Sequence, residues 1–450
     1  MKKTLSVIIC LLLVPALIGA CAEISDLNSI FESGHASLVP VSVAESIGFD
    51  PGMFSDNWML ISVSPDGSTY LFVIEGAFVA VRKGTIHIMQ PNYERGAEDV
   101  YGNLKSAFSM GFYRALDYSG IVWSPDGRYF SMTAYDRVMV NGRMEFDPFL
   151  FDTETGDVFL PATYANKIKD ENFGAVSEAA FSPDGRYFYF RVYRNSMNRY
   201  DLQTGENEVF LKMEDMDPVC RPAMCVTGDG SVLCLADPVD RKEPGKLMVY
   251  TQVYGVWVTV SRTLPIGIVG EQATGFVARK MAYSAQNGNC LIVSQENGSG
   301  KNYMSLFNCD SDSELKHMRH FTLRDDGTSA RIVEISTEDI DTEYWQALIN
   351  RDMPAASAYP YLTGCSLSPN GEFAFFAYSS PDHNGSKAAL VKLETLEMIE
   401  VELPETLIEQ ARFWESALTA AYKPGAVWLG DGRLLAYSSA GTTELFAFAE

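Results

Sequence analysis

Short apolar runs of strand length alternate with polar turn clusters along most of this 450-residue chain. The clearest example is WSPDGRYFSM at Trp123–Met132, whose turn residues recur in FSPDGRYFYF at Phe181–Phe190. β-Branched and aromatic residues on both sides of a Pro-Asp-Gly cluster predict two strands joined by a tight turn. Five weaker copies bring the number of predicted hairpins to seven, and they lie at Val63–Val73, Val226–Ala236, Tyr283–Val293, Leu367–Ala377 and Trp428–Ser438.

The repeated residues have the chemistry of a turn. Pro125 suits the second position of a type I turn because its ring fixes φ near about −65°. Asp126 can hydrogen-bond to nearby backbone, and Gly127 adopts positive φ without a Cβ penalty. Ligand binding by the repeated aspartates is the alternative, but turn formation alone accounts for each of them. We therefore expect the motif to form hairpins and to catalyse nothing.

A second turn, Asp-x-x-Thr-Gly, follows two of the hairpins at Leu150–Leu160 and Arg199–Phe210, with a degenerate copy at Val391–Val401. Each repeat then contains four strands, and four-stranded units repeated radially are the blades of a β-propeller. The turn glycines set the spacing of the repeats, and they are Gly67, Gly127, Gly185, Gly230, Gly288, Gly371 and Gly432.

These two motifs together resemble the TolB-type, WD40-like propeller repeat, often called PD40. The resemblance covers most of residues 58–450 and is strongest at Ser124 and Ser182. It implies an all-β fold: a single β-propeller, expected to have seven four-stranded blades. Six or eight blades stay open, because the long interval between Gly288 and Gly371 could contain a degenerate blade. Proteins of this type are extracytoplasmic binding scaffolds or the non-catalytic half of prolyl peptidases, and no G-x-S-x-G elbow of a peptidase half occurs here.

The ends of the repeats predict how the ring closes. The last repeat lacks an outer strand, and Ser37–Val43 has the composition to supply it, which would leave only short, protected edges. With strands A to D from inner to outer, the A–B and C–D turns share one face, called the turn face below. The B–C and D–A connections share the other, called the D–A face. The long connections Pro91–Ser119, Pro161–Ser177, Asp326–Thr363 and Pro404–Pro424 are expected there. Helical insertions are expected in two of them, at Asn103–Tyr118 and Glu405–Tyr422, where apolar residues recur at helical spacing.

The N-terminus predicts export. A basic start and an apolar run to Ala20 indicate a signal peptide at residues 1–22. Two interpretations stay open: a bacterial lipobox that makes Cys21 the lipidated N-terminus, or ordinary cleavage after Ala20-Cys21-Ala22. A tether at 23–36 and the propeller at 37–450 would follow. The expected location is extracytoplasmic, as a cell-surface lipoprotein or a secreted protein.

Charge narrows the choice of partner. The net charge is −23, and removal of Lys2 and Lys3 with the signal peptide leaves 33 basic against 58 acidic residues. An acidic surface repels phosphate backbones and anionic lipid. A nucleic-acid partner is not expected, and membrane contact is expected only through a lipid anchor. We expect a monomer that binds a protein or a glycan at the cell surface.

The sequence offers no catalytic, cofactor-binding or metal site, and no cofactor is expected. The five histidines are scattered, and His317 and His320 are expected beside a C–D turn rather than at a metal. Aromatic residues gather in the longest D–A connection. They suit a protein hot spot or sugar stacking, although they could equally only anchor the connection. The candidate binding surface is therefore Tyr344, Trp345, Tyr359 and Tyr361.

Two functional interpretations follow. The first is a non-enzymatic extracytoplasmic propeller scaffold. The alternative is a propeller enzyme, such as a lactonase, lyase or glycosidase, with its site on the D–A face, where Glu178 and Arg221 lie near the starts of inner strands.

Cysteine spacing raises a separate question. Cys225 and Cys234 would be opposed across one hairpin, and Cys290 and Cys309 across another, if each hairpin turned at its midpoint. Two disulfides or four free thiols both remain open.

Overall fold

The structure is a computed structural model of the full chain. It describes residues 27–48, 52, 58–98, 104–105, 121–133, 139–140, 143–144, 148–162, 179–192, 196–212, 224–236, 246–254, 256–263, 277–296, 302–310, 317–325, 329–335, 361–379, 386–407, 424–430, 432–438 and 444–449.

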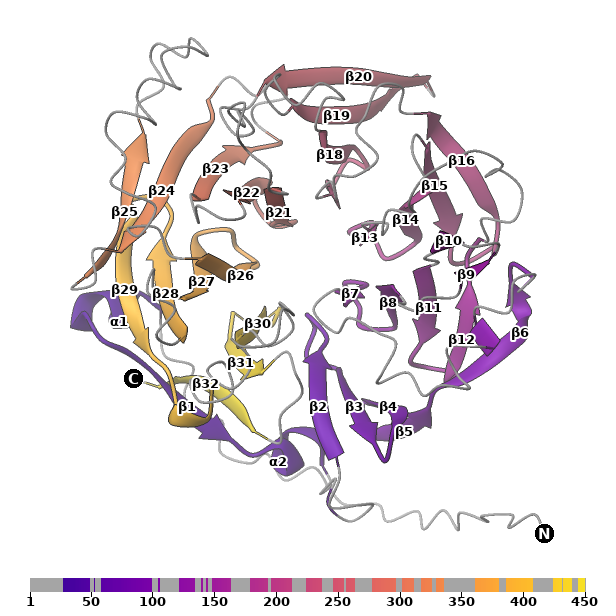
Figure 1. Ribbon diagram of the computed structural model, residues 1–450, viewed down its shortest axis with the longest axis horizontal. Coiled ribbons are helices and arrows are strands. Elements are labelled where there is room, and N and C mark those ends of the chain that lie inside the picture. The colour runs from indigo at the N-terminus through magenta and orange to yellow at the C-terminus, as the bar shows by residue number, and fades with distance from the viewer. Residues whose placement is uncertain are drawn as a thin grey trace.

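Strands dominate the described residues, and Figure 1 shows their sheets arranged about a common centre, as in a β-propeller. We number the repeats that carry the seven turn motifs as units 1 to 7 in chain order. Units 1, 3 and 4 are four-stranded antiparallel sheets in which strands adjacent in sequence pair. Their strands from the centre outward are β2 (Trp58–Val63), β3 (Thr69–Ile74), β4 (Ala77–Arg82) and β5 (Thr85–Ile88); β13 (Ala179–Phe181), β14 (Tyr187–Val192), β15 (Ser196–Asp201) and β16 (Asn207–Lys212); and β17 (Met224–Val226), β18 (Val232–Ala236), β19 (Lys246–Val253) and β20 (Val256–Thr263).

Units 2 and 5 each carry a fifth strand on the outer edge. The strands of unit 2 are β7 (Val122–Trp123), β8 (Tyr129–Thr133), β11 (Pro148–Asp152) and β12 (Asp157–Leu160). The extra strand β6 (Gln90–Gly96) runs parallel to β12. The strands of unit 5 are β21 (Val277–Tyr283), β22 (Asn289–Glu296), β23 (Asn302–Asn308) and β24 (Arg319–Asp325). The extra strand β25 (Ala330–Ile335) pairs antiparallel to β24. Both extra strands lie in the long connections predicted at Pro91–Ser119 and Asp326–Thr363, where no strand was expected, and both cover an otherwise unpaired edge. A separate hairpin joins β9 (Met139–Val140) to β10 (Arg143–Met144).

Units 6 and 7 share one sheet through the N-terminal strand β1 (Ala36–Val41). This strand runs parallel to β29 and antiparallel to β32, from Ser37 opposite Ala449 to Val41 opposite Leu445. The remaining strands are β26 (Tyr361–Leu367), β27 (Phe373–Ser379), β28 (Ser386–Lys392), β29 (Glu397–Glu402), β30 (Pro424–Trp428), β31 (Leu434–Ser438) and β32 (Leu445–Ala449). The first strand, β1, and the last strand, β32, therefore lie side by side in one sheet (Figure 1).

The core lies between adjacent sheets. Side chains of a strand point alternately to its two faces, so a strand packed on both sides is apolar throughout. In β3, Leu71 packs with Phe130 of unit 2, whereas its neighbour Phe72 packs with Leu435 of unit 7. Rings dominate these layers, and Phe130 stacks on Phe151 with centroids 4.3 Å apart. Each unit is thus held by its two neighbours.

Two short helices flank β1. Residues 27–33, expected to belong to a tether, form α1 (Leu27–Ser33), and its Ile30 and Phe31 are buried in the layer between units 6 and 7. The helix α2 (Val43–Ile47) begins at Ser42, which accepts a hydrogen bond from the Glu45 N–H, and ends at Gly48 in the left-handed conformation. Neither helix, nor any other in the described residues, is long and apolar enough to cross a bilayer.

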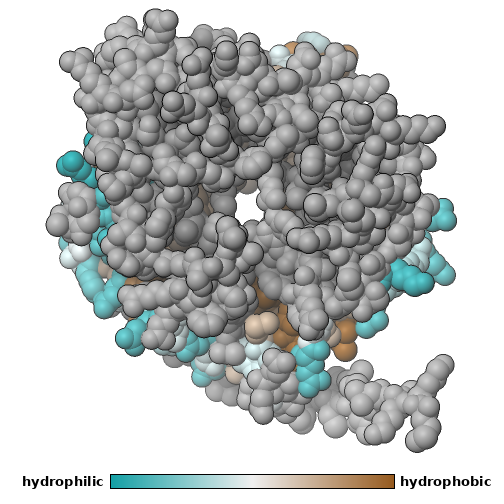
Figure 2. Space-filling model, in the orientation of Figure 1, coloured by the Kyte–Doolittle hydropathy of each residue, from teal (hydrophilic) through white to brown (hydrophobic). Residues whose placement is uncertain are grey.

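Figure 2 shows hydrophilic side chains on the outer rim among the described residues visible from this side. The largest hydrophobic area that shows lies in the sector where β2 follows β31 in Figure 1.

Candidate functional site

In units 1, 2, 3, 4 and 6 the turn follows one plan, in which a buried Ser or Thr hydroxyl bonds to the Asp or Asn two residues later. Ser124 is fully buried, and its hydroxyl donates to Asp126 at 2.6 Å and accepts from the Tyr129 N–H at 2.8 Å. The same Asp126 oxygen accepts from the Arg128 N–H at 3.1 Å. Gly127 has φ of 63°, and all seven turn glycines have positive φ. The predicted hairpins are therefore confirmed, and the turn aspartates are occupied by their own turns.

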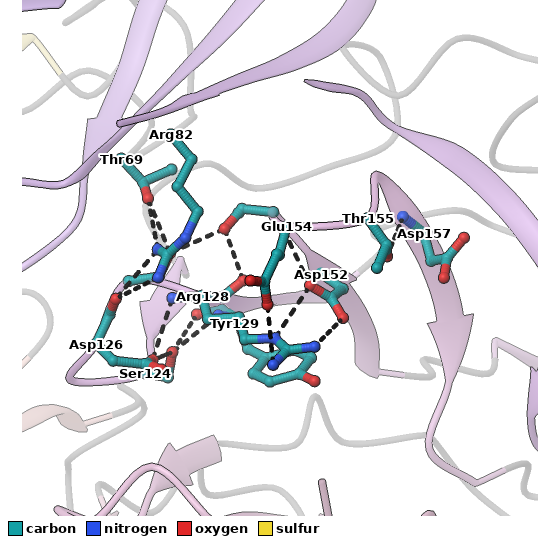
Figure 3. A network of polar contacts seen from close by, with 12 residues as sticks. Thr69, Arg82, Ser124, Asp126, Arg128, Tyr129, Asp152, Glu154, Thr155 and Asp157 are labelled. Atoms are coloured by element: carbon teal, nitrogen blue, oxygen red, sulfur yellow. Dashed lines mark hydrogen bonds and ion pairs between the residues drawn. The ribbon is translucent and has the colours of Figure 1, made fainter. Parts of the chain in front are cut away.

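Neighbouring turns also contact one another. Thr69 of unit 1 donates to the Gly127 carbonyl at 3.0 Å, and the guanidinium of Arg82 donates to the Asp126 carbonyl at 3.1 Å (Figure 3). A Cβ on Gly127 would lie 2.7 Å from that of Ser64, so this approach needs glycine. Similar bonds join unit 7 to unit 1, from Gly430 N–H to the Pro65 carbonyl, and unit 5 to unit 6, from Asn289 to the Gly371 carbonyl. Hydrogen bonds therefore join turns of neighbouring units across the turn face.

The densest polar cluster surrounds Asp152, the first residue of the C–D turn of unit 2 (Figure 3). Its carboxylate is fully buried and accepts from Arg95 at 2.9 Å, from Arg128 at 3.3 Å and from the Glu154 N–H at 3.0 Å. Arg95 belongs to β6, and its guanidinium lies 4.2 Å from the centroid of the Phe159 ring. Arg95 therefore fastens the extra strand β6 to unit 2.

The electrostatics of this cluster favour the ionised form of the Asp152 carboxylate. Burial by itself would raise the pKa of Asp152, but hydrogen bonds from Arg128, Arg95 and the Glu154 N–H outweigh it, so the pKa is lowered. Burial raises the pKa of the Tyr129 phenol, which receives a hydrogen bond from Arg95. Each of these charged groups has an opposite charge beside it. The chemistry available here is structural ion pairing.

Unit 3 repeats this pairing. Arg186 donates to Asp201 at 2.8 Å, and the backbone N–H groups of Gln203 and Thr204 bind the same carboxylate. In both units the arginine directly follows the glycine of the first motif, and the aspartate opens the second motif. This link between the two motifs is not among the sequence-based expectations. Their joint presence in units 2 and 3 was the signal that could have done so.

A second polar group lies between units 5 and 6, at the D–A ends of their strands. Lys387 donates to the fully buried carboxylate of Asp325 at 2.9 Å, and Glu400 accepts from the Ala330 N–H at 3.2 Å. The buried hydroxyl of Tyr378 has no hydrogen-bond partner among the described residues. Burial and then the carboxylates of Glu400 and Asp325 raise its pKa. These contacts join the end of β24 and the start of β25 to unit 6.

The sequence-predicted site residues are not brought together by the described structure. Tyr344, Trp345 and Tyr359 lie outside the described residues, as does Cys21. Tyr361 is the first residue of β26, opposite Ser379.

His320 has structural surroundings. His320 is buried on β24, its Nδ1 lies 2.8 Å from the Ser305 hydroxyl, and burial lowers its pKa to about 4. Among the residues that the structure describes, no group of three or more His, Cys, Asp or Glu side chains could hold a metal ion.

The proposed cysteine pairings need correction. Cys225 stands opposite Leu233, and Cys234 stands opposite Met224, so the register differs by one residue from the expected one. A shift of one residue reverses the face of a side chain, and the two thiols therefore lie in different layers. Cys290 stands opposite Phe307 and is diagonal to Cys309 on the same face. All four thiols are free.

Comparison with known proteins found no family model and no curated protein that matches this chain. Among solved structures, the chain is similar to the hydrazine synthase of Kuenenia stuttgartiensis, with 13% identity over 83% of this chain and 90% of that one and a TM-score of 0.40. It is also similar to a protein assigned as TolB from Agrobacterium tumefaciens, with 14% identity over 56% of this chain and 78% of that one and a TM-score of 0.32. The fold described above rests on this chain's own strand order, and membership of the TolB-type repeat family stays a prediction.

Proposed function

We propose that this chain is an exported, non-enzymatic β-propeller of seven blades, closed by β1, that binds a protein or glycan partner through its D–A face. Seven turn motifs, each in a unit with its own strands, support the blade count. The pairing of β1 with β32 supports closure by the two chain ends.

One observation carries the assignment of faces. Polar side chains of the turn face already have hydrogen-bond or ion-pair partners within and between turns, as Thr69, Asp126 and Asp152 illustrate. These groups therefore have little capacity left to bind a partner. Binding loops on rigid scaffolds are the segments that depart from the scaffold's pattern, and the D–A connections are those segments here.

The longest connection is the preferred contact region. Tyr344, Trp345, Tyr359 and Tyr361 supply aromatic surface suited to a protein hot spot or to stacking on a sugar ring. The candidate aromatic residues follow β25, whose last residue, Ile335, stands opposite His320 at the end of β24 away from the Lys387–Asp325 ion pair.

Export is tested in the native cell. In the lipobox interpretation, Cys21 becomes lipidated, and the protein partitions into the detergent phase of Triton X-114. The Cys21→Ala variant should then move to the aqueous phase and lose its lipid label. Equal partitioning of both proteins into the aqueous phase would support ordinary secretion, and retention of both in the cytoplasm would contradict export.

The two faces are compared by binding. Purified protein is applied to a glycan array and crosslinked to the surface of intact cells, and the affinity for the recovered ligand is then measured. Trp345→Ala should weaken binding at least tenfold, as expected for an aromatic hot spot. The control variants Gln203→Ala and Glu206→Ala change exposed residues of a C–D turn and should leave affinity unchanged.

All variants must melt at the temperature of the parent for this comparison. Loss of binding only in the turn variants would overturn the assignment of faces. Unchanged binding in Trp345→Ala, Tyr344→Ala and Tyr359→Ala would show that the connection is not the contact region.

A further inference from the structure

Three cysteines that are far apart in sequence meet at the boundary between units 4 and 5. Cys225 of β17 and Cys290 of β22 are buried in one layer, and Cys309, directly after β23, packs against it. Cys290 lies in the same layer as both Cys225 and Cys309. Cys290 is the shared neighbour of the other two.

The boundary around these thiols is fixed. The Tyr283 hydroxyl accepts a hydrogen bond from the Gly228 N–H at 2.8 Å and so ties the turn of unit 4 to unit 5. The Cys309 N–H donates to the Gly288 carbonyl at 2.8 Å. Cys234 lies on the opposite face of its sheet, in the layer toward unit 3. Of the five free cysteines in the described residues, three lie together at this boundary, whereas Cys234 and Cys365 pack against other layers.

We propose that Cys225, Cys290 and Cys309 form an oxidisable thiol site in which Cys290 is the common partner, and that a low-molecular-weight disulfide is its oxidant. Cys309 is the first to react, because it is partly exposed whereas Cys225 and Cys290 are buried. Burial raises the pKa of Cys290, which keeps this thiol protonated and unreactive until a neighbouring sulfur is activated.

The chemistry is thiol–disulfide exchange. The Cys309 thiolate attacks one sulfur of the small disulfide, forms a mixed disulfide and releases one small thiol. Cys290 then loses its proton to water and attacks the Cys309 sulfur, which forms the Cys290–Cys309 bond and releases the second small thiol. Two protein thiols are oxidised and one small disulfide is reduced to two thiols. The diagonal placement of Cys290 and Cys309 requires the Cys309 turn to approach slightly for bonding geometry.

Cys225 makes the site different from a simple pair. Its thiolate can attack Cys290 in the new disulfide and release Cys309, which moves the bond to Cys225–Cys290. This exchange converts a link within unit 5 into a link between units 4 and 5. Either product leaves one thiol of the three free.

Peptide mapping tests the site on the purified, folded chain and needs no partner. The reduced protein is incubated with oxidised glutathione, quenched with acid, alkylated in denaturant and digested with trypsin without reduction. Lys301 separates the Cys290 peptide from the Cys309 peptide, so a link between them is visible by mass. We expect loss of two thiols and a linkage that contains Cys290 in every product.

Variants assign the roles. Cys309→Ser should slow formation of any linkage at least tenfold, because the first thiol is lost. Cys290→Ser should stop the reaction at a glutathione adduct on Cys309, and Cys234→Ser should react like the parent. A linkage without Cys290, or no linkage in the parent after prolonged incubation, would overturn the proposal. The parent map alone decides this if a buried-site variant fails to fold.

Discussion

At the scale of residues, the polar side chains described above bond to the turns and strands of the propeller itself. Asp126 closes its own turn, while Asp152 joins the A–B turn, the C–D turn and the added strand β6 through Arg128 and Arg95. A fully buried carboxylate is stable only when it is paired and hydrogen-bonded. The identity of these residues is thus determined by the units that they connect.

Asp152→Asn tests this role. The substitution leaves Arg95 and Arg128 without their common anion and should lower the free energy of unfolding by about 2–3 kcal/mol at pH 7. Asp157→Asn is the matched control, because Asp157 contacts the same Arg95 at 3.1 Å but is partly exposed. The control should lose less than about 1 kcal/mol. Urea unfolding at neutral pH measures both losses.

The same pair of proteins gives a pH dependence. The pKa of Asp152 is lowered by folding, so its ion pairs stabilise the fold above the unfolded pKa of about 4 and are lost as pH falls through the folded pKa. The stability difference between the parent and Asp152→Asn should therefore be complete at pH 7 and shrink below about pH 4. A difference that stays constant down to pH 2.5 would contradict the assignment.

At the scale of elements, local chemistry made the hairpins predictable. A turn such as Ser124–Gly127 is determined by residues adjacent in sequence, and the strands on each side follow from their apolar pattern. Because the last repeat lacks an outer strand, the sequence also predicts that Ser37–Val43 supplies it. In the structure, β1 (Ala36–Val41) pairs with β32 of that unit.

The elements that were missed depend on distant partners. β6 and β25 are single strands with no turn motif of their own, and only the edges of β12 and β24 give them a place. The cysteine register was missed for a related reason. One residue in the turn that ends at Gly230 decides whether Cys225 and Cys234 share a face, and turn length alone did not determine it.

At the scale of the whole molecule, the units depend on one another. Apolar layers such as that of Leu71 and Phe130 lie between units, so a unit alone would expose both of its faces. The candidate contact residues could be named from the sequence only as a departure from the repeat, since no local rule predicts the conformation of a long connection. Closure of the ring is the feature on which this account most depends.

A designed disulfide measures closure directly. Val39 of β1 and Ala447 of β32 are cross-strand partners, and such a pair has the separation that a disulfide requires. Val39→Cys with Ala447→Cys should form an intramolecular bond between the two ends of a monomer, mapped by mass spectrometry. Val39→Cys with Phe448→Cys should remain reduced under the same mild oxidation, because Phe448 stands opposite Leu38 and its side chain lies on the other face of the sheet. Free thiols at positions 39 and 447 of the first variant would contradict a ring closed by its own first and last strands. A bond that forms only between two chains would contradict it as well.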